Sequence, residues 1–190
     1  MKNILIMIGI GLGLSACTAS NAVKTGSDIG DKPDWVQTMG RYDKGEGAIG
    51  ISPKSGMGTQ VQIDDAMLTA RNALAQNVDT KIQSAISQTR QRLIEQGVAG
   101  ASELGTLQTQ NAVRGLVNLR LKNSRPIKQW KDPENGELYV WVVIDQKDLI
   151  GMQADVLTKV IRKTLKDADE QHDQTIKEAF NEEFKKQFSN

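Results

Sequence analysis

The residue of this chain whose position most clearly suggests covalent chemistry is Cys17, its one cysteine. It follows an apolar run over residues 4–14, and Lys2 places a single positive charge before that run. The run is too short to cross a bilayer, which needs about 20 residues, but it has the length of the hydrophobic region of a signal peptide. Residues 1–16 are therefore predicted to be a signal peptide.

The sequence Leu14-Ser15-Ala16-Cys17 narrows this interpretation. Leu14 is too large for an ordinary signal-peptidase site, whereas Leu followed by two small residues and Cys resembles a bacterial lipobox. The resemblance implies a diacylglyceryl thioether on the Cys17 sulfur, cleavage before Cys17 and acylation of the new amino terminus. The alternative is an uncleaved signal anchor with an incidental cysteine.

Lipid on Cys17 would attach the chain to a membrane, and two or more acyl chains make such an attachment stable. Thr18 stands at the position where an Asp retains many lipoproteins of Gram-negative bacteria at the inner membrane. We therefore expect a lipid-anchored protein of the outer membrane, on the periplasmic face in preference to the cell surface.

Other residues that could do chemistry give weaker signals. His172, the one histidine, lies among acidic residues on a polar helical stretch, where a surface position is more common than a metal site. Gly45-Glu46-Gly47-Ala48-Ile49-Gly50 matches the spacing of a dinucleotide-binding loop, but no helix opens on it, and the segment is better interpreted as a strand whose glycines admit a closely packed helix. We expect no enzyme activity, no catalytic residue, no cofactor and no metal.

The net charge of the chain argues against nucleic acids as partners. The chain has 24 basic and 23 acidic residues, so loss of Lys2 with the signal peptide leaves a net charge of zero, which argues against a nucleic-acid-binding protein. Residues 104–131 nevertheless contain six basic residues and no acid. This stretch could face lipopolysaccharide phosphates or an acidic partner, although a solvated face offset by acids from other segments is the favoured interpretation.

Hydrophobic periodicity predicts an α+β fold with a small antiparallel sheet of about three strands packed against long helices. Residues 17–32 are small and polar and are expected to form a flexible tether, with the domain proper over 33–148 and a helical extension over 149–190. In the domain, strands are expected at 45–52, 124–131 and 137–145, and helices at 59–96 and 102–118. The strand at 137–145 is apolar on both faces and should be central and covered, with Trp141 buried and Trp35 near the edge of the domain.

The sequence leaves open what packs against the second half of the helix expected over 59–96. Thr59 and Gln62 fit a capping box at its start, and the helix would be over about 50 Å long, more than a small domain covers. Its second half could contact another chain, or it could be covered by later helices of the same chain.

Four segments, taken in order along the chain, are similar to the LPP-twenty lipoprotein family. They are Pro33-Asp34-Trp35-Val36 after the lipobox, a glycine-rich strand, Ala70-Arg71-Asn72-Ala73-Leu74-Ala75, and the strand Tyr139-Val140-Trp141-Val142-Val143-Ile144-Asp145. The family includes flagellar outer-membrane lipoproteins. The resemblance implies an α+β domain without catalysis and a structural or assembly role in the cell envelope, including the basal disk of the flagellum and motility. The alternative is a binding module for a small envelope ligand or an envelope polymer, with a pocket between the glycine-rich strand and the long helix.

The end of the chain suggests a partner. Phe180, Phe184 and Phe188 are the only phenylalanines and recur at every fourth residue, so they would form an apolar ridge on a helix. The polar residues 166–174 precede this ridge and disfavour its burial in the domain. The ridge is therefore expected to contact another copy of the chain, or an envelope or flagellar protein.

Overall fold

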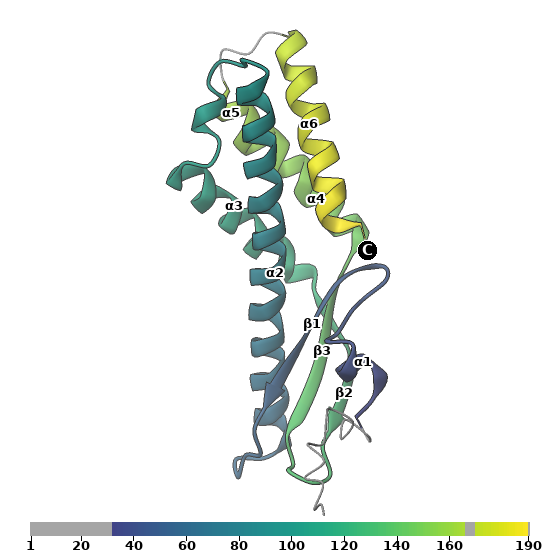
Figure 1. The fold of residues 1–190 in the computed structure, drawn as a ribbon. Coiled ribbons are helices and arrows are strands. Elements are labelled where there is room, and N and C mark those ends of the chain that lie inside the picture. The colour runs from purple at the N-terminus through teal and green to yellow at the C-terminus, as the bar shows by residue number, and fades with distance from the viewer. Residues whose placement is uncertain (1–31, 166–169, 190) are drawn as a thin grey trace, which may run out of the picture. The chain divides into compact units, whose positions relative to one another are not determined.

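The computed structural model describes residues 32–165 and 170–189, which belong to one compact unit beginning at Lys32 (Figure 1). The predicted signal peptide, Cys17 and the predicted tether lie outside the described residues, apart from Lys32 itself. The expected α+β fold is confirmed: a three-stranded antiparallel sheet packs against helices. The elements, in chain order, are α1 (Asp34–Gln37), β1 (Gly45–Ser52), α2 (Thr59–Glu95), α3 (Leu107–Arg120), β2 (Arg125–Lys131), β3 (Leu138–Asp145), α4 (Gln146–Val156), a π-helical turn (Leu157–Ile161), α5 (Arg162–Thr164) and α6 (Glu170–Phe188), with short 3-10 turns at Ala101–Glu103 and Leu121–Asn123.

The sheet has the strand order β1-β3-β2, so the strand that is apolar on both faces is the central one, as expected. Residue 141 of β3 lies opposite Ile49 of β1 and Lys128 of β2. The register of β2 shifts between Pro126 and Lys128, which is a β-bulge at the edge of the sheet. Both outer strands are joined to β3 alone.

The two faces of β3 divide the core. Leu138, Val140, Val142 and Ile144 point toward α2 and are buried in the main core. Tyr139 and Trp141 point the other way and pack with Trp35 and Val36 around α1. The alternation follows from the two-residue period of a strand.

The glycine-rich strand allows α2 to lie directly on the sheet. A Cβ atom added at Gly50 would lie 1.9 Å from the carbonyl oxygen of Ala66 and 2.3 Å from the backbone nitrogen of Ala70. The backbones of β1 and α2 are therefore in contact at this point, as the glycine pattern predicts. At Gly50 this close approach leaves no space for the pocket that the binding-module alternative placed between the glycine-rich strand and the long helix.

The predicted capping box at the start of α2 is wrong. The N-cap residue is Gly58, and no side chain caps the helix. Gln62 is buried and donates hydrogen bonds to the carbonyl oxygens of Pro53 and Gly136, at 2.8 and 3.1 Å. The side-chain amide therefore joins the β1–α2 connection to the β2–β3 turn, and these hydrogen bonds satisfy a buried polar group.

Later helices of the same chain cover the second half of α2, which settles the question of coverage. α3 and α6 both pack against α2, and α6 runs beside it in Figure 1. The expectation that Phe180, Phe184 and Phe188 contact a partner is wrong, because their side chains are 0%, 1% and 6% exposed within the main core. A polar stretch in sequence does not prevent a chain from folding back, and the apolar stripe of α2 offers the ridge a large surface to cover.

Candidate functional site

The side of the sheet opposite α2 carries an unusual set of residues. The chain has three tryptophans and two tyrosines, and all five gather there. We call this surface the aromatic face; it consists of Trp35, Tyr42, Trp130, Tyr139 and Trp141. The phenylalanines, by contrast, lie on α6 in the main core.

Trp141 is at the centre of the aromatic face. Its ring stacks on Trp35 with the ring centroids 5.9 Å apart and the planes at 6°, and Tyr42 meets it edge-on at 6.2 Å. Its indole N–H donates to the carbonyl oxygen of Gly40 at 2.8 Å. The expectation that Trp141 is buried is wrong, because its side chain is half-buried, whereas Trp35 is 7% exposed and packs with Val36 and Tyr139.

Two cations lie over these rings. The Lys32 ammonium donates to the Tyr139 hydroxyl at 2.9 Å and lies 4.9 Å from the centroid of that ring. The hydrogen bond from Lys32 to Tyr139 raises the pKa of the lysine above its ordinary value. The Lys128 ammonium lies 5.8 Å from the Trp141 ring centroid. Each position fits a cation–π contact, in which the ring quadrupole attracts a positive charge.

An ionic cluster closes one end of the aromatic face. Asp145, at the end of β3, accepts hydrogen bonds from the Tyr42 hydroxyl at 2.9 Å and from the Arg125 guanidinium at 2.9 and 3.1 Å. The Tyr42 hydroxyl, followed by Arg125, holds the pKa of the Asp145 carboxyl below its ordinary value, and the same cluster raises the pKa of Arg125. These contacts favour the ionised forms of the Asp145 carboxyl and the Arg125 guanidinium.

Half of the basic residues over 104–131, the three arginines, pair with acids from other segments, in line with the favoured interpretation. Arg114 pairs with Asp79 at 3.4 Å, and Arg120 pairs with Asp155 at 2.8 Å. Arg125 pairs with Asp145 as described above. The exposed Lys128 departs from this pattern, because its recorded contact is with a ring and not with a carboxylate.

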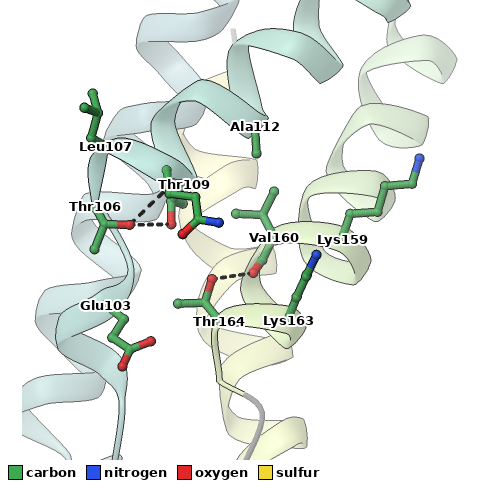
Figure 2. Close-up of a pocket in the computed structure, with 10 residues that line it drawn as sticks. Glu103, Thr106, Leu107, Thr109, Ala112, Lys159, Val160, Lys163 and Thr164 are labelled. Carbon is green, nitrogen blue, oxygen red and sulfur yellow. Dashed lines mark hydrogen bonds between the residues drawn. The ribbon is translucent and has the colours of Figure 1, made fainter.

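A groove of about 570 Å³ lies between the start of α3 and the π-helical turn (Figure 2). Thr106 caps α3 by accepting from the backbone N–H of Thr109, and Lys159 and Lys163 reach the groove from the other side. Both lysines are exposed, and Glu103 also lines the groove. Surface lysines and one helix start, with a carboxylate beside them, do not define a ligand.

The remaining residues that the sequence singled out do not assemble into a site. His172 is exposed on α6. Within residues 32–165 and 170–189, no group of three or more His, Cys, Asp or Glu side chains could hold a metal ion. The spacing that resembles a dinucleotide-binding loop lies inside β1, where its glycines serve packing. Cys17 falls outside the described residues.

No protein-family model matches the chain, and no curated protein matches it at a significant level. Across the described ranges, no helix is both long and apolar enough to cross a membrane. Among the described residues, we take the aromatic face as the candidate functional site, because it gathers all three tryptophans and both tyrosines of the chain. Sequence analysis missed it as a unit, although Tyr139, Trp141 and Trp130 have the alternating strand positions that could have shown it.

Proposed function

We propose that this chain is an outer-membrane lipoprotein with a structural or assembly role in the cell envelope. The observation that carries the proposal is the sequence Leu14-Ser15-Ala16-Cys17 after a short apolar run with a positive start. Its lipid anchor would hold the domain on the periplasmic side of the outer membrane. The resemblance to the LPP-twenty family supports the envelope role and suggests the flagellum as one place for it.

The chemistry of the described side chains agrees with a role other than catalysis. Asp145 and Arg125, the two groups of the ionic cluster, are engaged with each other and with Tyr42. The residues at the centre of the sheet stack on one another and do not line a cavity. Arrangements of this kind give a stable surface for contact.

The sheet has one outer strand that could take part in assembly. β2 carries Pro126, a bulge and lysines, which are features that discourage pairing with another chain. β1, with the sequence GEGAIGIS, has neither proline nor a basic residue. Its outer edge is therefore the better candidate for association with a partner strand.

Acylation can be tested directly. Cells grown with an acyl-chain analogue should label the protein, and Cys17→Ala should abolish the label while Ser15→Ala keeps it, because alanine is also small. Label that survives the loss of the Cys17 sulfur would refute the lipoprotein assignment. Fractionation of envelopes should then place the labelled protein in the outer membrane.

The assembly role needs a separate test. Deletion of the gene should impair an envelope structure, and motility is the first phenotype to measure because the family resemblance suggests the flagellum. Normal swimming with intact motors would remove the flagellar version of the proposal. Native mass measurement of detergent-extracted complexes would then show whether the chain assembles with itself or with other proteins.

A further inference from the structure

We propose that the aromatic face is a second membrane contact, which lies against the anionic phospholipid headgroups of the membrane that holds the anchor. The inference rests on the proposed function, because it needs the acylated Cys17 to bring the domain to the membrane. It adds which surface of the domain the membrane meets, and by which chemistry.

The residue types on the aromatic face suit a membrane interface. Tryptophan and tyrosine have an apolar body and a polar end, and they concentrate at the level of the headgroups. Trp130 and Trp141 remain partly accessible. Ile51, which lies opposite Tyr139 in the sheet, is 44% exposed, so an apolar side chain borders the rings.

A turn next to Trp141 adds a second apolar side chain. Gly40, which accepts the hydrogen bond from the Trp141 indole, follows Met39 directly. Met39 has a φ of 55° and is 80% exposed. The left-handed backbone is unfavourable for a residue with a side chain, and here it accompanies a methionine presented to solvent.

The anchor leads to this face. Lys32 is the first described residue, and its ammonium rests on Tyr139. Residues 18–31 separate it from Cys17 and could span about 50 Å when fully extended, or about 20 Å on average as a coil. The residue at which the predicted anchored segment joins the domain thus contacts the aromatic face.

The charges on the face favour an anionic surface. Asp145 is paired with Arg125, whereas Glu137, which accepts a hydrogen bond from the Tyr139 hydroxyl at 2.8 Å, and Asp132 keep their charges and partly offset that of Lys32. Lys32 and Lys128 remain as cations over the rings. A lysine near an anionic membrane contributes about 1 kcal/mol, so the two together would favour the docked domain by about 30-fold.

A second copy of the chain fits the face less well. In a two-fold dimer the same patch meets itself, so the lysines of both copies would gather at one interface. Lys128 has no carboxylate within ion-pairing distance among the described residues to offset that repulsion. Phospholipid phosphates instead supply the opposite charge.

Tryptophan fluorescence tests the proposal cleanly, because all three tryptophans of the chain belong to the aromatic face. The lipidated full chain is reconstituted into vesicles of phosphatidylglycerol and brominated phosphatidylcholine. We expect a loss of tryptophan emission relative to vesicles without bromine, together with protection from aqueous iodide. Lys32→Gln with Lys128→Gln should lower the ratio of docked to free domain by about 30-fold. Lys177→Gln with Lys185→Gln on α6 is the matched control and should change nothing.

Three other outcomes of this experiment are possible, and each refutes the membrane contact, alone or together with the proposed function. A chain that is acylated and vesicle-bound but keeps its emission would overturn the membrane contact and leave the proposed function intact. Protection from iodide without quenching by bromine would show that protein, such as a second copy, covers the face, which also overturns it. A chain that carries no acyl group would remove the proposed function and this inference together.

Discussion

A methyl group added at Gly50 should separate the sheet from its longest helix. The added Cβ of Gly50→Ala would lie 1.9 Å from the Ala66 carbonyl oxygen, whereas ordinary contacts of this kind begin at 3.4 Å. The atoms that must give way are backbone atoms of α2, which cannot rotate aside as the end of a side chain can. The helix would therefore have to retreat from β1 by about 1.5 Å, the difference between these two distances.

The cost follows from the packing that this shift would loosen. Ala66, Ala70 and Leu74 are fully buried between α2 and the sheet. Overpacking a core costs about 1–3 kcal/mol and occasionally more, and contact with rigid backbone puts Gly50→Ala at the upper end. For a domain of this size, about 3 kcal/mol lowers the melting temperature by about 6–12 °C.

Urea unfolding followed by circular dichroism measures the change, and Gly115→Ala in α3 is the matched control. A Cβ at Gly115 meets nothing within 4 Å, and alanine in a helix interior is more favourable than glycine by about 0.5–1 kcal/mol. The two substitutions are chemically identical, so opposite signs are expected. If Gly50→Ala leaves the free energy of unfolding within about 0.5 kcal/mol of the wild type, the close approach of β1 and α2 is refuted.

Three further predictions concern the core, the aromatic face and pH. Phe184→Ala should lower the free energy of unfolding by about 3–5 kcal/mol, because it removes a fully buried ring, and denaturant titration measures the loss. Trp141→Phe should lower it by about 1–3 kcal/mol by leaving the Gly40 carbonyl without its donor, as thermal melts would show. The lowered pKa of Asp145 predicts stability that is present above the ordinary aspartate pKa of about 3.9 and is lost as the pH falls through the folded value. Asp145→Asn should flatten that part of the acid limb in a plot of stability against pH.

Each of these has a control on the same domain. Ile150→Ala removes a side chain that is 55% exposed and should cost much less than the Phe184 substitution. If Phe184→Ala instead changes the native mass without changing stability, the ring belongs to an interface between chains. Trp35→Phe keeps the stacked ring and does not touch the Gly40 carbonyl, so an equal loss in both tryptophan variants would contradict the hydrogen-bond explanation. Asp148→Asn should leave the acid limb of Asp145 in place.

Patterns in the sequence predicted those helices and strands well that depend on the side chains of neighbouring residues alone. The alternation of residues 138–144 identified a central strand, because side chains of a strand point to its two faces in turn. The long run of apolar residues at helical spacing predicted 59–96, within a residue of α2. The prediction that the glycines of 45–50 lie in a strand and admit a closely packed helix is confirmed at Gly50.

Other features depended on contacts between distant parts of the chain. The partners of Gln62 lie in the β1–α2 connection and in the turn at Gly136, so the capping pattern in the sequence gave the wrong role. The polar residues before the ridge at Phe180–Phe188 suggested a separate extension, and only the packing of α6 against α2 placed the rings in the core. The same limit applies to Trp35, whose burial depends on a ring more than 100 residues away at Trp141.

The sequence by itself carries the prediction of a lipobox, from the small residues before Cys17, and it determined the periodicity that makes a strand or a helix amphipathic. These are local because a peptidase reads consecutive residues and because side-chain direction repeats every two or 3.6 residues. Only the tertiary structure decided that five aromatic side chains from three separate segments gather on one side of the sheet, where Lys32 contacts Tyr139. Strand pairing brings such residues together, and the register that does so is fixed by the packing of the whole sheet on α2.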